Sequence, residues 1–170
     1  QIVEDDTNLF FRTALNRARR EGLEIIEARC DDFGAHALMR LSAAWKKTKT
    51  LRNRDLAFFA RPAVYADEPA VRKFFAVRDG EARAFVAFDP LFRDGRAFGY
   101  AANILRQDPR EAPGLCDAVI LHAAQQFKSE GLEQLNRGML PFCPPPEGDD
   151  SPRGSPLSRL IVDTNWKLLN

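Results

Sequence analysis

Three polar residues at one junction of this sequence could together bind an ester or phosphate group and an ammonium group. Asn103 and Arg106 stand at the end of a β-type run, and Asp117 falls in the first turn of the helical pattern that follows. Strand-to-helix junctions of open α/β sheets are common ligand sites. Arginine binds carbonyl or phosphate oxygens, and a carboxylate holds an ammonium group. We take Asn103, Arg106 and Asp117 as candidate catalytic residues.

The position of Asp117 near a helix N-terminus predicts a carboxylate that the helix dipole keeps ionised. Such a group is a weak general base and a good ligand for an ammonium group. The alternative is that Asp117 only caps its helix and that Arg106 forms a surface ion pair.

The loop between that strand and helix, residues 107–114, argues against a coenzyme A site. A pyrophosphate cradle needs backbone N–H donors from glycines. This loop holds two prolines, which lack the donor, and two acidic residues, which repel phosphate. His36 and His122 stand apart from cysteines and carboxylates at ligand spacing, so we expect no cofactor and no metal.

A basic stretch runs from Arg40 to Arg54 and contains a tryptophan, Trp45. It has no acidic residue before Asp55, and its basic residues are Arg40, Lys46, Lys47, Lys49, Arg52 and Arg54. Such a stretch could meet tRNA or anionic lipid. The other interpretation, a solvated helix end with lysines at the negative pole of the dipole, stays open.

Size and composition indicate one folded domain over residues 1–170. The chain has 170 residues, a net charge of +1 and 29% charged residues, which excludes a wholly disordered protein. Its three cysteines, Cys30, Cys116 and Cys143, suit reduced thiols in the cytoplasm. No apolar run is long enough to span a bilayer. Because the chain starts at Gln1, we expect a piece of a longer polypeptide, whose other parts could include a membrane segment.

The elements that must position the candidate residues alternate between helical and strand patterns. Helical periodicity covers residues 8–21, 35–47 and 115–130. Strand patterns cover residues 23–29, 73–77, 82–88, 97–105 and 132–140. Asp79-Gly80 and Asp94-Gly95 predict two hairpin turns, and the last strand-helix-strand unit predicts a parallel crossover. The result is an α/β fold with a mixed sheet flanked by helices, and residues 143–158 are predicted to be a mobile, proline-rich loop.

Several segments, in order along the chain, carry a resemblance to a known family. They are Arg12–Ala18 with Glu21-Gly22, Leu41-Ser42-Ala43-Ala44-Trp45, Tyr100–Arg106, Ala112–Asp117, Lys128–Gly131 and Asn136–Phe142. Together they resemble the C-terminal domain of the aminoacyl-phosphatidylglycerol synthases, which has a GNAT-like acyltransferase fold. Two departures stand out. The family pattern has Asp-Leu-Met-Arg where this chain has Asn103-Ile104-Leu105-Arg106, and the family continues past Asn170 into a lysine-bearing segment.

The resemblance implies transfer of an aminoacyl group from aminoacyl-tRNA to a lipid hydroxyl such as that of phosphatidylglycerol, at the inner face of the cell membrane. It makes Arg12, Arg17, Lys128 and Arg137, which lie in the matching segments, candidate substrate-binding residues. Two alternatives stay open: a non-catalytic or regulatory domain of the same fold, and an acyl-CoA-dependent N-acyltransferase.

Overall fold

A computed structural model describes residues 7–48 and 61–137. All of these residues belong to one compact unit that ends at Gly138. In chain order the elements are α1 (Thr7–Arg20), β1 (Glu24–Glu27), a 3-10 turn (Cys30–Asp32), α2 (Ala35–Lys47), β2 (Arg72–Arg78), β3 (Glu81–Arg93), β4 (Arg96–Gln107), α3 (Leu115–Ser129) and β5 (Gln134–Asn136). The predicted loop at residues 143–158 and Cys143 lie outside the described residues, whereas Cys30 and Cys116 are free thiols.

The five strands form one mixed sheet in the order β1-β2-β3-β4-β5. The first four strands pair antiparallel, and β4 pairs with β5 in parallel, with Gly99 opposite Gln134. The crossover through α3 makes this parallel pairing possible. The α/β fold with a mixed sheet flanked by helices is therefore confirmed. The last strand, predicted over residues 132–140, is observed as Gln134–Asn136, and residues 138–140 of that prediction lie outside the described residues.

The two predicted hairpins form at the expected residues. Asp79 and Gly80 have φ angles of 54° and 73°, and Asp94 and Gly95 have φ angles of 51° and 76°. Positive φ at both central residues matches the right-handed twist of the flanking strands. These turns bring β2, β3 and β4 side by side, and they bring the candidate residues of β4 next to β3.

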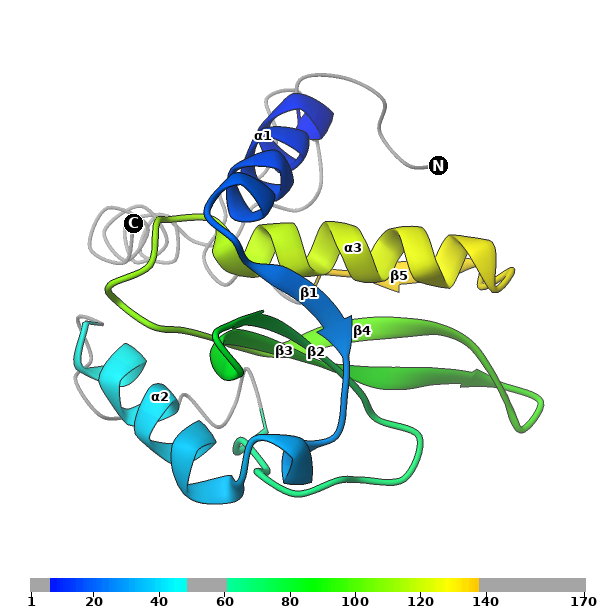
Figure 1. The fold of residues 1–170 in the computed structure, drawn as a ribbon. Coiled ribbons are helices and arrows are strands. Elements are labelled where there is room, and N and C mark those ends of the chain that lie inside the picture. Colours follow the sequence, from blue (N-terminus) through cyan, green and yellow to red (C-terminus); the bar gives the residue numbers. More distant parts are fainter. Residues whose placement is uncertain (1–6, 49–60, 138–170) are drawn as a thin grey trace, which may run out of the picture. The chain divides into compact units, whose positions relative to one another are not determined.

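Helices cover both faces of the sheet (Figure 1). On one face α1 and α3 pack against Phe74, Val86, Phe88 and Tyr100. On the other face α2 packs through Leu38 and Leu41, which share a core cluster with Phe75, Phe85 and Ile104. We call these the α3 face and the α2 face. Among the described residues no helix is long and apolar enough to cross a membrane.

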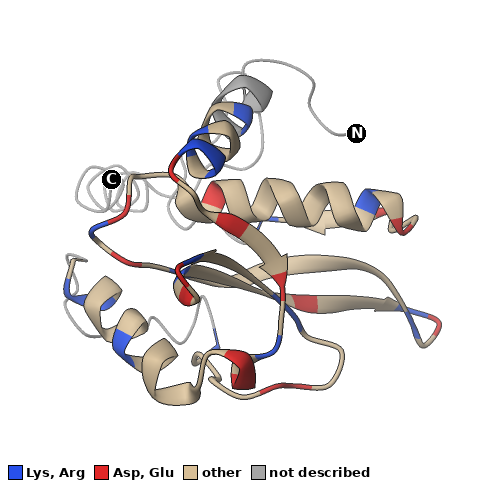
Figure 2. Ribbon diagram, in the orientation of Figure 1, with Lys and Arg blue, Asp and Glu red and all other residues tan. Residues whose placement is uncertain are grey.

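Local sequence explains where the helices begin and end. The last turn of α1 carries Arg17, Arg19 and Arg20, which complement its dipole. After it, Gly22 adopts a φ of 74°, and the amide of Leu23 donates to the carbonyl of Ala18 at 2.9 Å, which closes the helix. α2 also ends in basic residues, Lys46 and Lys47, and carries no acidic residue (Figure 2).

Candidate functional site

Arg106 lies on the α2 face and is 6% exposed. Its Nε donates to Ser42 Oγ on α2 at 2.8 Å, and one terminal nitrogen donates to the carbonyl of Leu105 at 2.9 Å. The guanidinium carbon lies 4.4 Å from the centre of the Trp45 ring. The alternative of a surface ion pair is wrong for Arg106, because the side chain is buried against a helix.

Asn103 lies at an irregularity of the β3-β4 ladder. Phe88 pairs with Ala102 and Ala87 pairs with Ile104, so Asn103 is the extra residue of a bulge. Its side-chain amide donates to Asp89 Oδ2 on the neighbouring strand. A carboxylate is thus present beside position 103, although β3 supplies it instead of β4.

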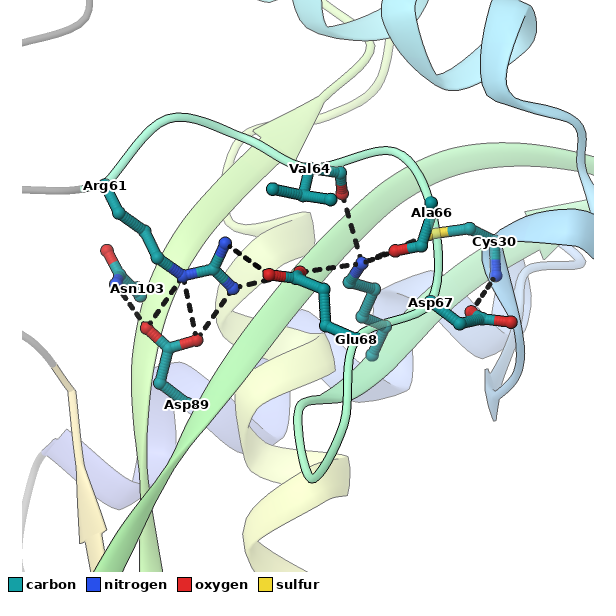
Figure 3. Close-up of polar contacts among 9 residues, drawn as sticks. Cys30, Arg61, Val64, Ala66, Asp67, Glu68, Asp89 and Asn103 are labelled. Carbon is teal, nitrogen blue, oxygen red and sulfur yellow. Dashed lines mark hydrogen bonds and ion pairs between the residues drawn. The ribbon is translucent and has the colours of Figure 1, made fainter.

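Asp89 belongs to an ionic network that crosses the sheet (Figure 3). Arg61 binds Asp89 at 2.8 Å and reaches Glu68 at 2.9 Å. Glu68 in turn lies 3.2 Å from Lys73 Nζ, and this ammonium also donates to the carbonyls of Val64 and Ala66. Lys73 has a side chain that is only 3% exposed, so the loop of residues 61–71 closes over it.

The network keeps its carboxylate ionised. Burial by itself would raise the pKa of Asp89, but hydrogen bonds from Arg61 and Asn103 outweigh it and lower the pKa. The pKa of Arg61 is raised, chiefly by its hydrogen bonds to Asp89. Sequence reasoning missed Arg61, Glu68, Lys73 and Asp89, because charged residues separated along the chain give no pattern that predicts their pairing.

Asp117 contacts a different element from Arg106. It lies in the first turn of α3, and Arg137 donates to its Oδ1 at 3.1 Å. Burial is the larger influence on this carboxyl and raises its pKa, against the opposing effect of Arg137. Burial thus opposes the stabilisation of the anion that the helix N-terminus predicts for Asp117.

Two of the candidate residues, Asp117 and Arg137, form an ion pair. The side chain of Arg106 contacts Ser42 and Trp45 of α2, and its backbone carbonyl lies 3.5 Å from Cys116 Sγ of α3. The side chain of Asn103 binds Asp89. Of the candidate catalytic residues, Asp117 therefore pairs with a candidate substrate-binding residue, and Asn103 and Arg106 have separate side-chain partners on neighbouring elements.

The remaining candidate residues lie on the helices that cover the α3 face. Arg17 donates from its guanidinium to the carbonyl of Pro113, which ties α1 to the start of α3. Arg12 is exposed on α1, and Lys128 is exposed in the last turn of α3. These three side chains contribute charge to the surface around the two helices.

A groove of about 450 Å³ opens beside α2. Its lining combines apolar residues of α2 with three arginines from different elements, Arg40, Arg83 and Arg110. Two of the arginines are already paired, Arg83 with Glu81 at 2.8 Å and Arg110 with Asp108 at 2.7 Å. Within the described residues no cluster of histidine, cysteine and acidic side chains could hold a metal ion.

Comparison with known proteins now identifies the family. A model of the phosphatidylglycerol lysyltransferase C-terminal domain matches residues 10–164. The chain belongs to this family. A curated relative, an uncharacterized protein of Corynebacterium glutamicum, is 27% identical over 154 residues, which is 88% of this chain and 19% of that protein. The chain therefore spans about a fifth of that relative.

Solved structures agree on the fold. The L-PGS structure of Bacillus licheniformis superposes with a TM-score of 0.67 at 18% identity, over 98% of this chain and 49% of that one. The C-terminal domain of a putative lysylphosphatidylglycerol synthetase from Agrobacterium fabrum gives 0.57 at 19% identity, over 80% of this chain and 42% of that one. An aminoglycoside acetyltransferase from an uncultured soil sample gives 0.50 at 13% identity, over 87% of this chain and 88% of that one. The fold is GNAT-like.

Proposed function

We propose that this domain takes part in moving an aminoacyl group from aminoacyl-tRNA to a lipid hydroxyl, such as that of phosphatidylglycerol, at the inner face of the cell membrane. The family match over residues 10–164 is the observation that carries the proposal. Strand β4 adds chemical support, because it carries the buried guanidinium of Arg106 and also the carboxamide of Asn103, which binds the Asp89 carboxylate.

In such a transfer the lipid hydroxyl oxygen attacks the ester carbonyl carbon and negative charge builds on the carbonyl oxygen. The bond to the ribose oxygen then breaks, and this oxygen leaves as a hydroxyl with the proton that the lipid hydroxyl gives up. We assign Arg106 to that oxygen or to a phosphate of the substrate. Asn103 acts with it by holding Asp89 in place. Asp117 and Arg137, which pair with each other on the α3 side of the sheet, are assigned to charged groups of the two substrates away from the reacting ester.

The basic residues fit two anionic partners. Arg40, Lys46 and Lys47 lie along α2 without an acidic neighbour on that helix (Figure 2). Lysine and arginine on one surface attract the phosphates of tRNA and of anionic lipid. Arg12, Arg17 and Lys128 are assigned to the same task beside α1 and α3.

The test is a transfer assay with the full natural polypeptide that carries this domain, charged tRNA and phosphatidylglycerol vesicles. Arg106→Lys should lose activity nearly as completely as Arg106→Ala, because a lysine cannot reproduce the forked guanidinium geometry. Melting temperatures of both variants separate a lost function from a lost fold.

Three outcomes contradict the proposal in whole or in part. Normal turnover by Arg106→Ala removes Arg106 from the reaction. Absence of transfer by the wild-type polypeptide with every charged tRNA favours the non-catalytic alternative, and transfer from acyl-CoA in the same assay favours the N-acyltransferase alternative.

A further inference from the structure

We infer that Trp45 and Ser42 are positioning residues that fix the guanidinium of Arg106 for the transfer reaction. The inference rests on the proposed function and adds two residues of α2 to it. Ser42 and Trp45 are one helical turn apart, so both side chains reach the same face of α2. Arg106 meets both of them although Ser42 lies 64 positions earlier in the sequence.

The two contacts restrict different motions of the arginine. The hydrogen bond from Arg106 Nε to Ser42 Oγ, at 2.8 Å, limits movement of the guanidinium within its own plane. The ring of Trp45, whose centre is 4.4 Å from the guanidinium carbon, limits movement out of that plane. A cation held over an aromatic face is attracted by the ring quadrupole, and the attraction is stronger away from water.

The helix that carries these residues is itself anchored in the core. Leu38 is 1% exposed and Leu41 is 9% exposed, and both pack in the same cluster as Ile104 of β4. Ser42 is 1% exposed, so its hydroxyl faces the sheet and not solvent. α2 and β4 therefore form a rigid frame around Arg106, and catalytic groups require this kind of support to hold their geometry.

A purely structural role for the same contacts predicts a different result. If Arg106 only joined α2 to the sheet, the loss of Trp45 would lower stability and would affect turnover independently of Arg106. If Trp45 acts through Arg106, its loss changes turnover only while Arg106 is present. A double-mutant cycle measures this difference.

The experiment uses the full natural polypeptide in the transfer assay described above. Trp45→Leu and Ser42→Ala should each lower kcat about tenfold, which corresponds to about 1.4 kcal/mol of lost positioning. KM for the lipid should change less than kcat. Trp45→Phe, which keeps an aromatic face, should restore most of the turnover.

The decisive variant combines Trp45→Leu with Arg106→Ala. Its kcat should equal that of Arg106→Ala alone, and additive losses would overturn the inference while the proposed function stood. Phe127→Leu serves as a control, because it weakens the core cluster under α3 and leaves the frame of α2 and β4 around Arg106 intact. It should lower the melting temperature and leave kcat of the folded enzyme within about twofold.

A second readout does not depend on activity. The NMR shift of the Arg106 Nε proton should move toward its free value in Trp45→Leu and stay close to wild type in Trp45→Phe. An unchanged shift in Trp45→Leu overturns the inference. Absence of transfer by the wild-type protein overturns the proposed function instead, and the NMR shift then still decides whether α2 holds the guanidinium.

Discussion

The two faces of the sheet are lined by different kinds of side chain. The α3 face is aromatic: Phe127 packs edge-on against Phe74 and Phe88, with ring centres 5.6 and 5.3 Å away, and stacks on Tyr100 at 4.8 Å. The α2 face buries Lys73 and Arg106 among its apolar side chains. Charged groups are rarely buried unless they are paired, because leaving water is costly.

The comparison indicates a division of labour. The core residues of the α3 face are apolar or aromatic, and the guanidinium of Arg72 lies over the Phe127 ring at 4.7 Å and pairs with Glu27 and Glu130. On the α2 face, buried charged side chains lose contact with water, which costs free energy, and their contacts hold them in fixed positions. Four predictions test this difference, from the largest expected effect to the smallest.

Phe127→Ala should cause the largest loss of stability. The ring is 2% exposed and contacts three other aromatic residues, so its removal should lower the free energy of unfolding by about 3 to 5 kcal/mol. Urea denaturation measures the loss. Phe92→Ala is the matched control, because Phe92 is 59% exposed and should change stability by less than about 0.5 kcal/mol. A loss below about 1 kcal/mol in Phe127→Ala would show that the α3 face is not the stabilising core.

Lys73→Met should lower the free energy of unfolding by less, about 1 to 3 kcal/mol. The loss arises because hydrogen-bonding groups are left without a partner, and not because side-chain volume is removed. The change removes the ammonium from the carbonyls of Val64 and Ala66 and from Glu68, while it keeps a long apolar side chain. Lys47→Met, at an exposed position of α2, is the control in the same urea titration. A variant at least as stable as wild type would mean that the buried charge does not hold the loop of residues 61–71.

Asp89→Asn should change how stability depends on pH. The pKa of Asp89 is lower in the folded state than its unfolded value of about 3.9, so the carboxylate stabilises the fold above that pH and loses this effect as the pH falls through the folded pKa. The stability difference between wild type and Asp89→Asn should therefore be largest near neutral pH and shrink below about pH 4. Unfolding curves from pH 7 to pH 2 measure it. A difference that stays constant with pH would contradict the network in Figure 3.

Asp117→Asn should have the smallest effect and the opposite sign. Its pKa is raised in the folded state, so folding disfavours the ionised carboxylate at neutral pH, and this penalty fades as the pH falls through the folded pKa and is gone below the unfolded value of about 3.9. The neutral amide removes this penalty. The variant should be equal to or slightly more stable than wild type at pH 7, and it should lose this advantage below about pH 4. A clear loss of stability at pH 7 would make the ion pair with Arg137 more important than burial.

The fold could be predicted because its signals are local. Asp79-Gly80 and Asp94-Gly95 predict hairpins from the backbone freedom of those residues alone, and Gly22 predicts the end of α1. The spacing of apolar residues predicts which face of α3 is buried. These features need no knowledge of the rest of the chain.

The candidate site could be predicted only in part, because the residues that contact Asn103 and Arg106 are distant from them along the chain. The sequence places Asn103 and Arg106 near the end of one strand, and both lie on β4, while their part in a reaction stays a prediction. Their partners Asp89, Ser42 and Trp45 come from other elements, and a β-bulge at Asn103 decides which face each residue meets. Asp117 was assigned to the same crevice because it follows closely in sequence, but α3 carries it to the other side of the sheet.

Gly99 gives the protein engineer a point at which the sheet can be opened. A Cβ atom at this position would lie 2.3 Å from the carbonyl oxygen of Gln134, so any other residue at 99 must push β5 away from β4. Libraries that randomise this residue should return glycine alone among variants that keep the parallel pair. By the same reasoning, Gly99→Ala should separate β5 from β4 and leave the four antiparallel strands paired.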